Sequence, residues 1–337
     1  WQTVWREAVS PYGLKSAYIV PELDQSRFIV YPEFNGLQTG QKLRVNVKDG
    51  GKTVSTQTIP AATPCVAILP VKNVKTWSPE SPFLYDVELE VLDASGAVLD
   101  QVKSYSGMRK VHIVGNEFYL NNKPVYLRMV LDQGYYPEGV WTAPTDADLK
   151  RDIELSMAAG FNSARLHQKV FAERFHYWAD KLGYLTWGES SSWGGNTNNP
   201  VTARNFLPEW EEIVKRDRNH PSILAWTPFN ETWERPDSPE EAIQHDRFVI
   251  DVYKLSHDLD YRPVNGVSGG YHVITDLLST HQYMQKPDEL KEFLRIKDGV
   301  YPQFNHRKEV PYAGQPYYLD EYCGIKWVVG KESAPYT

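Results

Sequence analysis

The 337-residue sequence is poor in cysteine, in positive charge and in long apolar runs. Its two cysteines, Cys65 and Cys323, are too few for a disulfide framework. With 36 Lys and Arg against 43 Asp and Glu, the net charge is −7, so the chain has no overall basic field for nucleic acid or anionic lipid. No run of about 18 apolar residues is present, which argues against a membrane-spanning helix.

Aromatic residues are abundant instead, with 11 Trp and 21 Tyr. Both side chains combine a flat apolar face with a polar tip. Most of them belong in a core, but the C–H faces of pyranose sugars also pack well on such rings. The composition therefore leaves two interpretations open, a large aromatic core alone or a core together with a sugar-binding cleft.

The length is generous for one domain and comfortable for two. The sequence starts at Trp1 without a methionine or a leader segment, and residues 1–7 have the pattern of a strand. We expect both ends to be truncations of a longer protein, so the sequence leaves its compartment open.

Residues 16–113 have the pattern of an antiparallel β domain. Apolar residues 43, 45 and 47 alternate with polar ones, a turn signal follows at 49–51, and residues 53–59 return as the partner strand. A second pair of alternating segments surrounds a turn at Ser95-Gly96. This spacing predicts a small β-sandwich with a structural role.

From Glu117 onward, short apolar strands alternate with longer helical patterns, which is typical of parallel βα units. Thr145 and Asp148 form a capping-box pattern at the start of the first helix, and Gly160 ends it. Strands are expected at 125–131, 162–166, 184–187, 223–229, 263–267, 279–283 and 317–320.

Such a repeat predicts a (β/α)₈ TIM barrel that is truncated before strand eight. An open doubly wound sheet is the alternative, but residues 132–137 after the first strand are not a Gly-rich phosphate loop. Because an open barrel would expose strand edges, we expect the eighth strand to lie beyond residue 337. The predicted division is 1–15 for the end of a preceding sandwich, 16–113 for the second sandwich and 114–337 for the barrel.

Chemistry in a TIM barrel sits where the strands end. Glu231 follows the fourth strand and Glu321 the seventh, so the two carboxylates would face each other over the barrel mouth. Paired carboxylates near aromatic rings suit glycosidic cleavage, in which one protonates the leaving oxygen and the other attacks or activates water. Alternatively, either residue caps a loop or pairs with Arg165.

Five motifs in order carry a resemblance: WSPESPFLY at 77–85, NNKP at 121–124 before LRMV at 127–130, GFNSARLH at 160–167, FNETW at 229–233 and YYLDEY at 317–322. Together they resemble glycoside hydrolase family 2 over nearly the whole chain. The resemblance implies the end of a sugar-binding sandwich, an immunoglobulin-like sandwich and a catalytic barrel.

The resemblance also implies roles. Glu231 is similar to the family's acid/base and Glu321 to its nucleophile. Asn230 would bind the sugar 2-hydroxyl, Arg165 would keep the nucleophile ionised, and Tyr283 would lie beside it. The alternative for Arg165 is a structural pairing with Glu189 or with a backbone carbonyl. Further candidates for sugar contacts, each with a structural alternative, are His167, His281, Trp193, Trp327, Asp132 and Gln133.

Three departures from the family pattern are visible. Thr232-Trp233 follows the acid/base where a small polar residue is common, and Cys323 stands where Gly is commoner. No partner that would lower its pKa accompanies this thiol, so a reactive cysteine is not expected. Residues 189–193 lack the ligands with which some family β-galactosidases hold Mg²⁺, and no His-Glu-x-x-His motif is present, so neither a metal nor a cofactor is expected.

The sequence thus predicts a retaining exo-β-glycosidase acting on a β-glycoside, with surroundings that keep Glu231 protonated and Glu321 ionised. A β-galactoside is the favoured substrate. β-Glucuronidase, β-mannosidase and arabinopyranosidase stay open, because the family's uronate motif Asn-x-Lys occurs only at 73–75, in the wrong domain. The rival of another class is a non-catalytic carbohydrate-binding protein. No nucleic-acid or membrane partner is expected, and homo-oligomers would form through domains outside this sequence.

Overall fold

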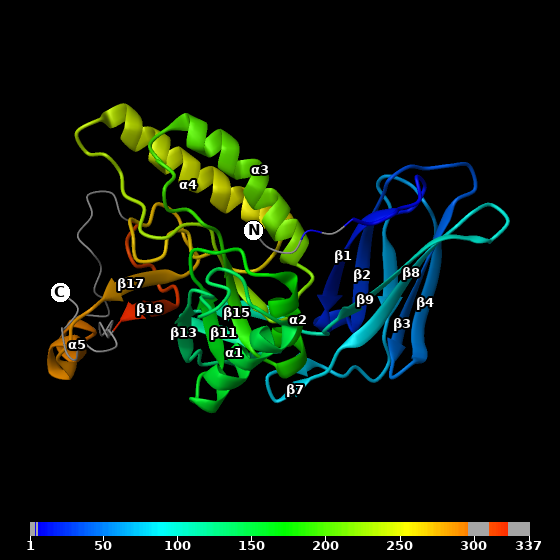
Figure 1. Ribbon diagram of the computed structural model, residues 1–337, viewed down its shortest axis with the longest axis horizontal. Coiled ribbons are helices and arrows are strands. Elements are labelled where there is room, and N and C mark those ends of the chain that lie inside the picture. The colour runs from blue at the N-terminus through cyan, green and yellow to red at the C-terminus, as the bar shows by residue number, and fades with distance from the viewer. Residues whose placement is uncertain (1–3, 5, 296–309, 323–337) are drawn as a thin grey trace.

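The computed structural model describes residue 4, residues 6–295 and residues 310–322. An all-β unit lies at one end of the elongated molecule and a unit of strands and helices at the other (Figure 1). This arrangement confirms the predicted order of a sandwich followed by a barrel domain. The strand expected at residues 1–7 is absent from its described residues 4, 6 and 7, which lie beside no strand with which they pair.

The sandwich consists of a three-stranded and a four-stranded antiparallel sheet. Alternation along β3 explains why the sheets stack, since Leu43, Val45 and Val47 are fully buried while the residues between them are partly exposed. The first sheet contains β1 (Leu14–Glu22), β2 (Arg27–Phe34) and β5 (Ala67–Pro70), with η1 (Leu23–Gln25) between the first two. The second contains β3 (Lys42–Asp49), β4 (Lys52–Pro60), β8 (Tyr85–Leu92) and β9 (Val98–Ser106).

A connecting region packs under the barrel. The Pro-rich segment forms the short pair β6 (Trp77–Ser78) and β7 (Ser81–Pro82). Trp77 is fully buried among barrel residues, and its Nε1 donates a 2.8 Å hydrogen bond to the Asp180 carbonyl. A small antiparallel sheet follows, made of β10 (Val111–Val114), β11 (Glu117–Leu120) and β12 (Lys123–Pro124). The end expected for the sandwich, residue 113, lies within β10.

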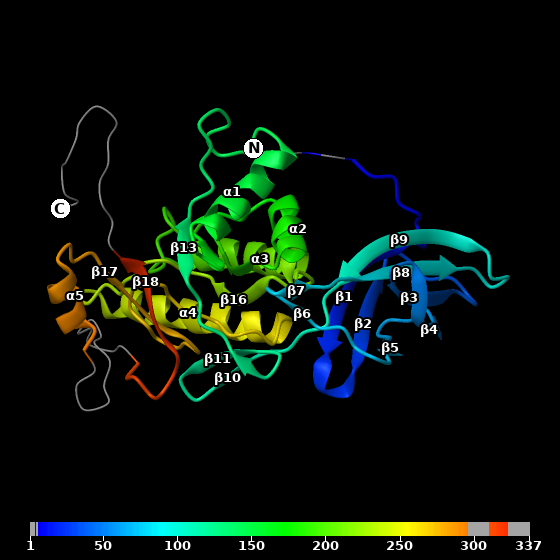
Figure 2. The same cartoon turned by 90° about the horizontal axis from the view of Figure 1, so that it is seen from below.

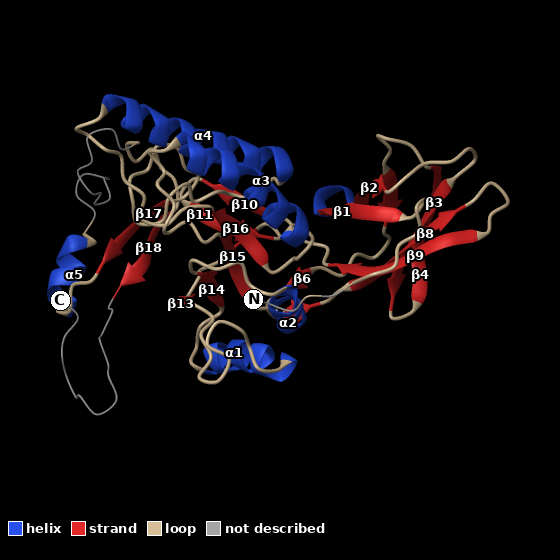
Figure 3. Ribbon diagram, turned by 45° about the horizontal axis from the view of Figure 1, so that its top comes forward, coloured by secondary structure: helices blue, strands red, loops and turns tan. Residues whose placement is uncertain are grey.

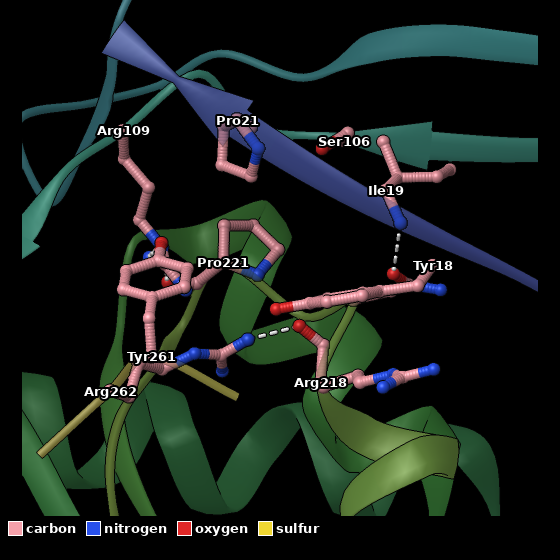
Figure 4. A pocket seen from close by; sticks show the side chains of 11 residues that line it. Tyr18, Ile19, Pro21, Ser106, Arg109, Arg218, Pro221, Tyr261 and Arg262 are labelled. Carbon is pink, nitrogen blue, oxygen red and sulfur yellow. Dashed lines mark hydrogen bonds between the residues drawn. The ribbon is translucent and has the colours of Figure 1, made fainter. Parts of the chain in front are cut away.

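Side chains of the sandwich and of the barrel unit contact each other where the two units meet (Figure 4). Asn219 of the barrel unit accepts a 2.9 Å hydrogen bond from the Ile19 backbone N–H and donates one of 2.8 Å to the Ala17 carbonyl. Arg218 stacks 3.9 Å from the centre of the Tyr18 ring. Arg109 is buried and donates to the Pro221 carbonyl at 2.6 Å. The barrel unit is therefore docked on β1 through backbone-directed hydrogen bonds.

The barrel unit holds a parallel sheet in the order β13-β14-β15-β16 and a parallel pair β17-β18, with helices outside them (Figures 2 and 3). The strands are β13 (Met129–Asp132), β14 (Ser163–Leu166), β15 (Leu185–Glu189), β16 (Ile223–Thr227), β17 (Leu278–Gln282) and β18 (Tyr317–Tyr322). The helices are α1 (Asp146–Ala158), α2 (Glu173–Leu182), α3 (Pro200–Asp217), α4 (Pro239–Leu259) and α5 (Pro287–Phe293).

The predicted helix signals are confirmed. Thr145 caps α1, and Thr145 and Asp148 form the complete capping box. Gly183 ends α2 with φ of 74°, and a Cβ there would lie 2.6 Å from the Pro79 carbonyl oxygen. Among the described helices, none combines the length and the apolar character that crossing a bilayer requires.

The strand predicted at 263–267 is wrong, because only two isolated parallel bridges, Trp226 with Val264 and Asn230 with Ser268, continue the sheet there. Proline at 263 has no N–H to donate. The Val264 N–H donates instead to the Asp276 carboxylate at 2.8 Å. A side chain therefore takes the place that a neighbouring strand would fill. The first strand also starts at 129 rather than 125, and an eighth strand would lie outside the described residues.

Candidate active site

The carboxyl ends of the parallel strands bring the predicted polar side chains together. Arg165 comes from β14 and His281 from β17, while Glu321 lies on β18 and Glu231 follows β16. One carboxylate oxygen of Glu231, one of Glu321 and a ring nitrogen of His281 all lie within 4.8 Å of one another. The two carboxylates that stand 90 residues apart in the sequence (231 and 321) thus face each other across a short gap.

Glu231 is held in a backbone conformation that non-glycine residues rarely adopt, with φ of 50°. Its N–H donates to the Ser268 carbonyl at 2.9 Å, and the parallel bridge between Asn230 and Ser268 supports the same turn. This turn directs the half-buried carboxylate toward His281. An outlier maintained in this way is typical of functional positions, where the surrounding structure offsets the cost.

His281 lies between acidic groups. Its Nδ1 is 2.7 Å from Glu231 Oε1, while its Nε2 is 3.0 Å from Ser268 Oγ and 3.4 Å from Asp320 Oδ1. Burial alone would lower the pKa of His281, but the Asp320 charge and the hydrogen bond to Glu231 outweigh burial and raise it. His281 is thus a site residue that binds its neighbouring carboxylates rather than an isolated core histidine.

The surroundings do not favour the protonated Glu231 that the sequence analysis expected. The hydrogen bond from His281 is the largest influence and holds the pKa of Glu231 below its ordinary value, against the opposite effect of burial. The sequence did not reveal this contact, because it depends on where β17 places His281 relative to the turn after β16.

Arg165 is 1 % exposed and donates hydrogen bonds to several groups at once. Its Nε donates to Glu189 Oε2 at 2.7 Å, Nη1 to Glu321 Oε1 at 3.0 Å and Nη2 to Asn230 Oδ1 at 2.5 Å. The two alternatives considered for Arg165, pairing with Glu321 or with Glu189, are therefore both present in the structure. The guanidinium shares its positive charge between the two carboxylates.

The sequence analysis considered Glu189 only as an alternative partner of Arg165. Burial alone would raise its pKa, but the Arg165 charge outweighs burial and holds the pKa below its ordinary value. Asp320 was missed, and it accepts a 2.6 Å hydrogen bond from Ser268 Oγ. The signal available for both was their position at a strand end, beside a residue already selected.

Tyr283 and His167 both lie beside Glu321. The Tyr283 hydroxyl donates to Glu321 Oε2, the oxygen that Arg165 does not contact. His167 Nδ1 lies 2.8 Å from Arg165 Nη2 and 3.7 Å from Glu321 Oε1. Both oxygens of Glu321 therefore have a hydrogen-bond donor, which fixes the orientation of the carboxylate.

The remaining candidates differ in their placement. Trp193 belongs to the site, because its Nε1 donates to the Asn230 carbonyl at 3.2 Å. Asp132 accepts a 2.8 Å hydrogen bond from the Gly134 N–H in its own turn, and burial raises its pKa. Gln133 is exposed on the same loop. Trp327 lies outside the described residues, as does Cys323.

Glu231, His281 and Glu321 present ligand atoms close enough for one cation. Each is already engaged, Glu231 with His281 and Glu321 with Arg165 and Tyr283. The opposite charges and short hydrogen bonds of this cluster account for its geometry, and the arrangement fits internal charge pairing better than a metal centre.

Two family models match the chain. Residues 14–109 match "Glycosyl hydrolases family 2", and residues 111–323 match "Glycosyl hydrolases family 2, TIM barrel domain". The second match alone covers more than half of the sequence, and it contains Glu231 and Glu321.

Curated relatives have similar but divergent sequences. A β-galactosidase of Pseudoalteromonas haloplanktis is 28 % identical over 298 residues, which cover 85 % of this chain and 26 % of the relative. A protein of Formosa agariphila named putative β-glucuronidase is 28 % identical over 267 residues, covering 76 % of this chain and 32 % of the relative. This chain spans about a quarter to a third of the length of these relatives.

A solved structure supports the fold. The β-glucuronidase from Ruminococcus gnavus in complex with D-glucuronic acid has a TM-score of 0.67 and 25 % sequence identity. The match covers 81 % of this chain and 44 % of that protein.

Proposed function

This chain belongs to glycosyl hydrolases family 2, and we propose that it carries the catalytic centre of a retaining exo-β-glycosidase, with Glu231 as acid/base and Glu321 as nucleophile. One observation carries the proposal: the two carboxylates, from different strand ends, have oxygens within 4.8 Å of each other beside a buried arginine. Retaining enzymes place their carboxyl groups about 5–5.5 Å apart, whereas inverting enzymes leave room for a water.

The reaction proceeds by two displacements. Glu321 forms a bond to the anomeric carbon as the glycosidic C–O bond breaks, and Glu231 gives its proton to the leaving oxygen. Glu231 then takes a proton from water, whose oxygen attacks the anomeric carbon and releases the Glu321 carboxylate. The sugar leaves with the configuration it had at the start.

The neighbours of Glu321 suit a nucleophile. Arg165 Nη1 lies 3.0 Å from Oε1 and the Tyr283 hydroxyl donates to Oε2, so the carboxylate is oriented before substrate arrives. Asn230 is fixed by Arg165 through its side-chain oxygen, which leaves its amide N–H₂ group to donate to the 2-hydroxyl of the sugar.

The proton that the leaving oxygen requires lies between Glu231 and His281. The pKa of His281 is raised and that of Glu231 lowered, so the pair holds one proton over a range in which an isolated carboxyl would have lost it. Glu231 protonates the leaving oxygen, and His281 Nδ1, 2.7 Å away, passes a proton to Glu231. His281 is thus a positioning residue that supplies Glu231, the acid, with its proton.

We propose a β-galactoside as the substrate, in line with the β-galactosidase relative. A β-glucuronide is the second candidate, favoured by the putative β-glucuronidase relative and by the likeness to the Ruminococcus gnavus enzyme.

Activity assays on the full-length protein test the proposal. kcat/KM is measured with 4-nitrophenyl β-galactoside and 4-nitrophenyl β-glucuronide, and NMR identifies the first anomer released. Turnover of one of them with the β-anomer formed first is the expected result. The α-anomer formed first would overturn the retaining mechanism, and binding of these sugars without turnover would favour the non-catalytic carbohydrate-binding alternative.

A further inference from the structure

A cavity of about 450 Å³ lies beside Glu231, between the loop 192–198 after β15 and residues 230–235 after β16. Trp193 and Trp233 line it from opposite loops, and their side chains are 61 % and 41 % exposed. The two displacement steps use Glu231 and Glu321 and do not explain why a cavity with two tryptophans lies beside Glu231. Large indole rings left open to solvent beside a reactive carboxylate indicate a surface built for a ligand.

We propose that this cavity binds the leaving group, and that the leaving group is itself a sugar, stacked on Trp193 and Trp233. The inference rests on the proposed function, because it takes Glu231 as the acid. A group that protonates the leaving oxygen must lie on the leaving-group side of the bond that breaks. The cavity that borders Glu231 is therefore where the departing moiety lies.

The lining has the chemistry of sugar recognition. Asn196, Thr197 and Thr232 add neutral amide and hydroxyl groups to the two indole rings. A pyranose offers the matching surface, with apolar C–H faces for the rings and hydroxyls for the polar groups. The positive charge at Arg235, at the rim, has Glu241 at 3.7 Å, so the cavity does not select for an anion.

Hydrogen bonds anchor the backbone of Trp193. Its backbone N–H donates to Gln168 Oε1 at 2.9 Å, and Gln168 Nε2 donates to Ser192 Oγ at 3.0 Å. Gln168 itself has φ of 51°, and its N–H donates to Glu189 Oε1 at 2.9 Å. A chain of hydrogen bonds therefore connects this wall of the cavity to the carboxylate that pairs with Arg165.

The two loops are also connected to each other. Asn198 Nδ2 donates to the Trp233 carbonyl at 3.4 Å, and Trp193 Nε1 donates to the Asn230 carbonyl. The walls are thus preorganised relative to Glu231, which reduces the cost of ordering them when a ligand binds.

A larger cavity of about 690 Å³, lined by Trp141, Lys169 and Phe171, borders neither carboxylate. It therefore offers no contact to a departing group. Its tryptophan, 42 % exposed, provides a matched control for Trp233.

The experiment compares three substrates in the full-length protein: lactose, 4-nitrophenyl β-galactoside and β-galactosyl fluoride, or their glucuronyl counterparts if the enzyme prefers them. Fluoride is a leaving group without a ring. Trp233→Ala is expected to lower the ratio of kcat/KM for the disaccharide to that for the fluoride by about two- to tenfold, the scale of one lost stacking contact. Trp141→Ala is expected to leave the ratio unchanged.

Several results would overturn the inference. An unchanged ratio would show that the cavity does not bind the leaving sugar, and an equal loss on all three substrates would show that Trp233 only supports Glu231. A loss confined to the nitrophenyl substrate would assign the cavity to aromatic leaving groups. If Trp233→Ala does not fold, Trp233→Leu, which keeps apolar volume without a flat face, decides by the same ratio. Failure of the proposed function is distinct, because the wild-type protein would then turn over none of the three substrates.

Discussion

Arg165 determines the charge balance among the residues of the site. One guanidinium lies within hydrogen-bonding distance of Glu189, Glu321 and Asn230. The sequence predicted that this arginine needs a carboxylate partner and named both candidates. It did not predict that the partners are shared, because the sharing depends on the side-by-side placement of β14 and β15 and on the turn that brings in β18.

Replacing Arg165 by Met tests its part in the chemistry. The variant loses the donors to Glu321 Oε1 at 3.0 Å and to Asn230 Oδ1 at 2.5 Å, so both side chains lose their orientation. kcat/KM on an aryl glycoside should therefore fall by about 10²-fold. The variant should also lose about 3–5 kcal/mol of stability, because Glu189 stays buried without its partner. A folded variant of reduced stability whose kcat/KM equals that of the wild type would show that Arg165 supports only the fold.

The two carboxylates are distinguished by their dependence on the leaving group. Glu231→Gln should retain activity on activated aryl glycosides, whose leaving groups need little protonation, while losing about 10²–10⁴-fold on natural substrates. Glu321→Gln should lose turnover of both kinds of substrate. The measurement is kcat/KM for each variant on each substrate. Equal losses on both substrates in the two variants would contradict the assignment of roles.

At the scale of elements, the sequence predicts a helix or strand correctly where residues close to one another in the sequence determine it. The hairpin of β3 and β4 follows from alternation and a Gly-Gly turn, and the start of α1 follows from Thr145 and Asp148. The absence of a regular strand at 263–267 could not be predicted, because it depends on the bond from the Val264 N–H to Asp276, twelve residues away on a returning loop. The contact between His281 and Glu231 was also missed, since it joins two elements 50 residues apart.

The segment 263–270 makes a close contact with β17 that glycine alone permits. Gly269 has φ of 59°, and a Cβ there would lie 2.2 Å from the His281 ring. Gly269→Ala should therefore displace His281 from Glu231 and reduce kcat/KM at least tenfold on substrates that need an acid. The readout is kcat/KM on an aryl glycoside and on a disaccharide.

Gly160→Ala is the matched control for this substitution. Gly160 also has a positive φ, of 92°, but a Cβ there would meet nothing within 4 Å. Both variants should lose about 1 kcal/mol of stability from the unfavourable backbone conformation, and Gly269→Ala should lose more because its Cβ collides with the His281 ring. Only Gly269→Ala should lose activity, and an equal loss in both would show that the close contact with His281 is unimportant.

At the scale of the whole molecule, the sandwich and the barrel unit share a buried polar interface. Tyr105 of β9 donates to Asp180 Oδ2 at 2.8 Å, and His220 Nδ1 lies 2.6 Å from the same oxygen. His176 stacks on His220 with ring centres 5.0 Å apart. The sequence indicated neither this network nor the pKa shifts of its histidines, because both depend on how the two units pack together.

Burial lowers the pKa of His176 to about 4, against the attraction of Asp217, with Nε2 and Oδ2 3.6 Å apart. The unfolded chain therefore binds a proton below about pH 6.5 that the folded chain does not bind until about pH 4. Stability should fall as pH decreases through this window, by about 3 kcal/mol in total, and the fall should end near pH 4. His220, whose pKa is raised because the Asp180 charge outweighs burial, contributes stability that is lost at higher pH.

Urea unfolding at several pH values measures this slope. His176→Leu should remove most of the pH dependence between pH 6.5 and pH 4. A slope identical to that of the wild type would show that other groups determine the stability of the interface at low pH.

Trapping the covalent intermediate is the most direct test of the central claim that Glu321 is the nucleophile of a retaining mechanism. The full-length protein is incubated with a 2-deoxy-2-fluoro-β-galactosyl fluoride, or with the glucuronyl analogue if that sugar is preferred. The 2-fluorine slows both steps, because it destabilises the oxocarbenium-like transition state, while the good leaving group lets the first step occur. Mass spectrometry of the intact protein and of its peptides then locates the sugar. The account predicts one 2-fluoroglycosyl group on Glu321 and none on the Glu321→Gln variant, whereas a label on another residue, such as Glu189, or turnover without any covalent label would contradict it.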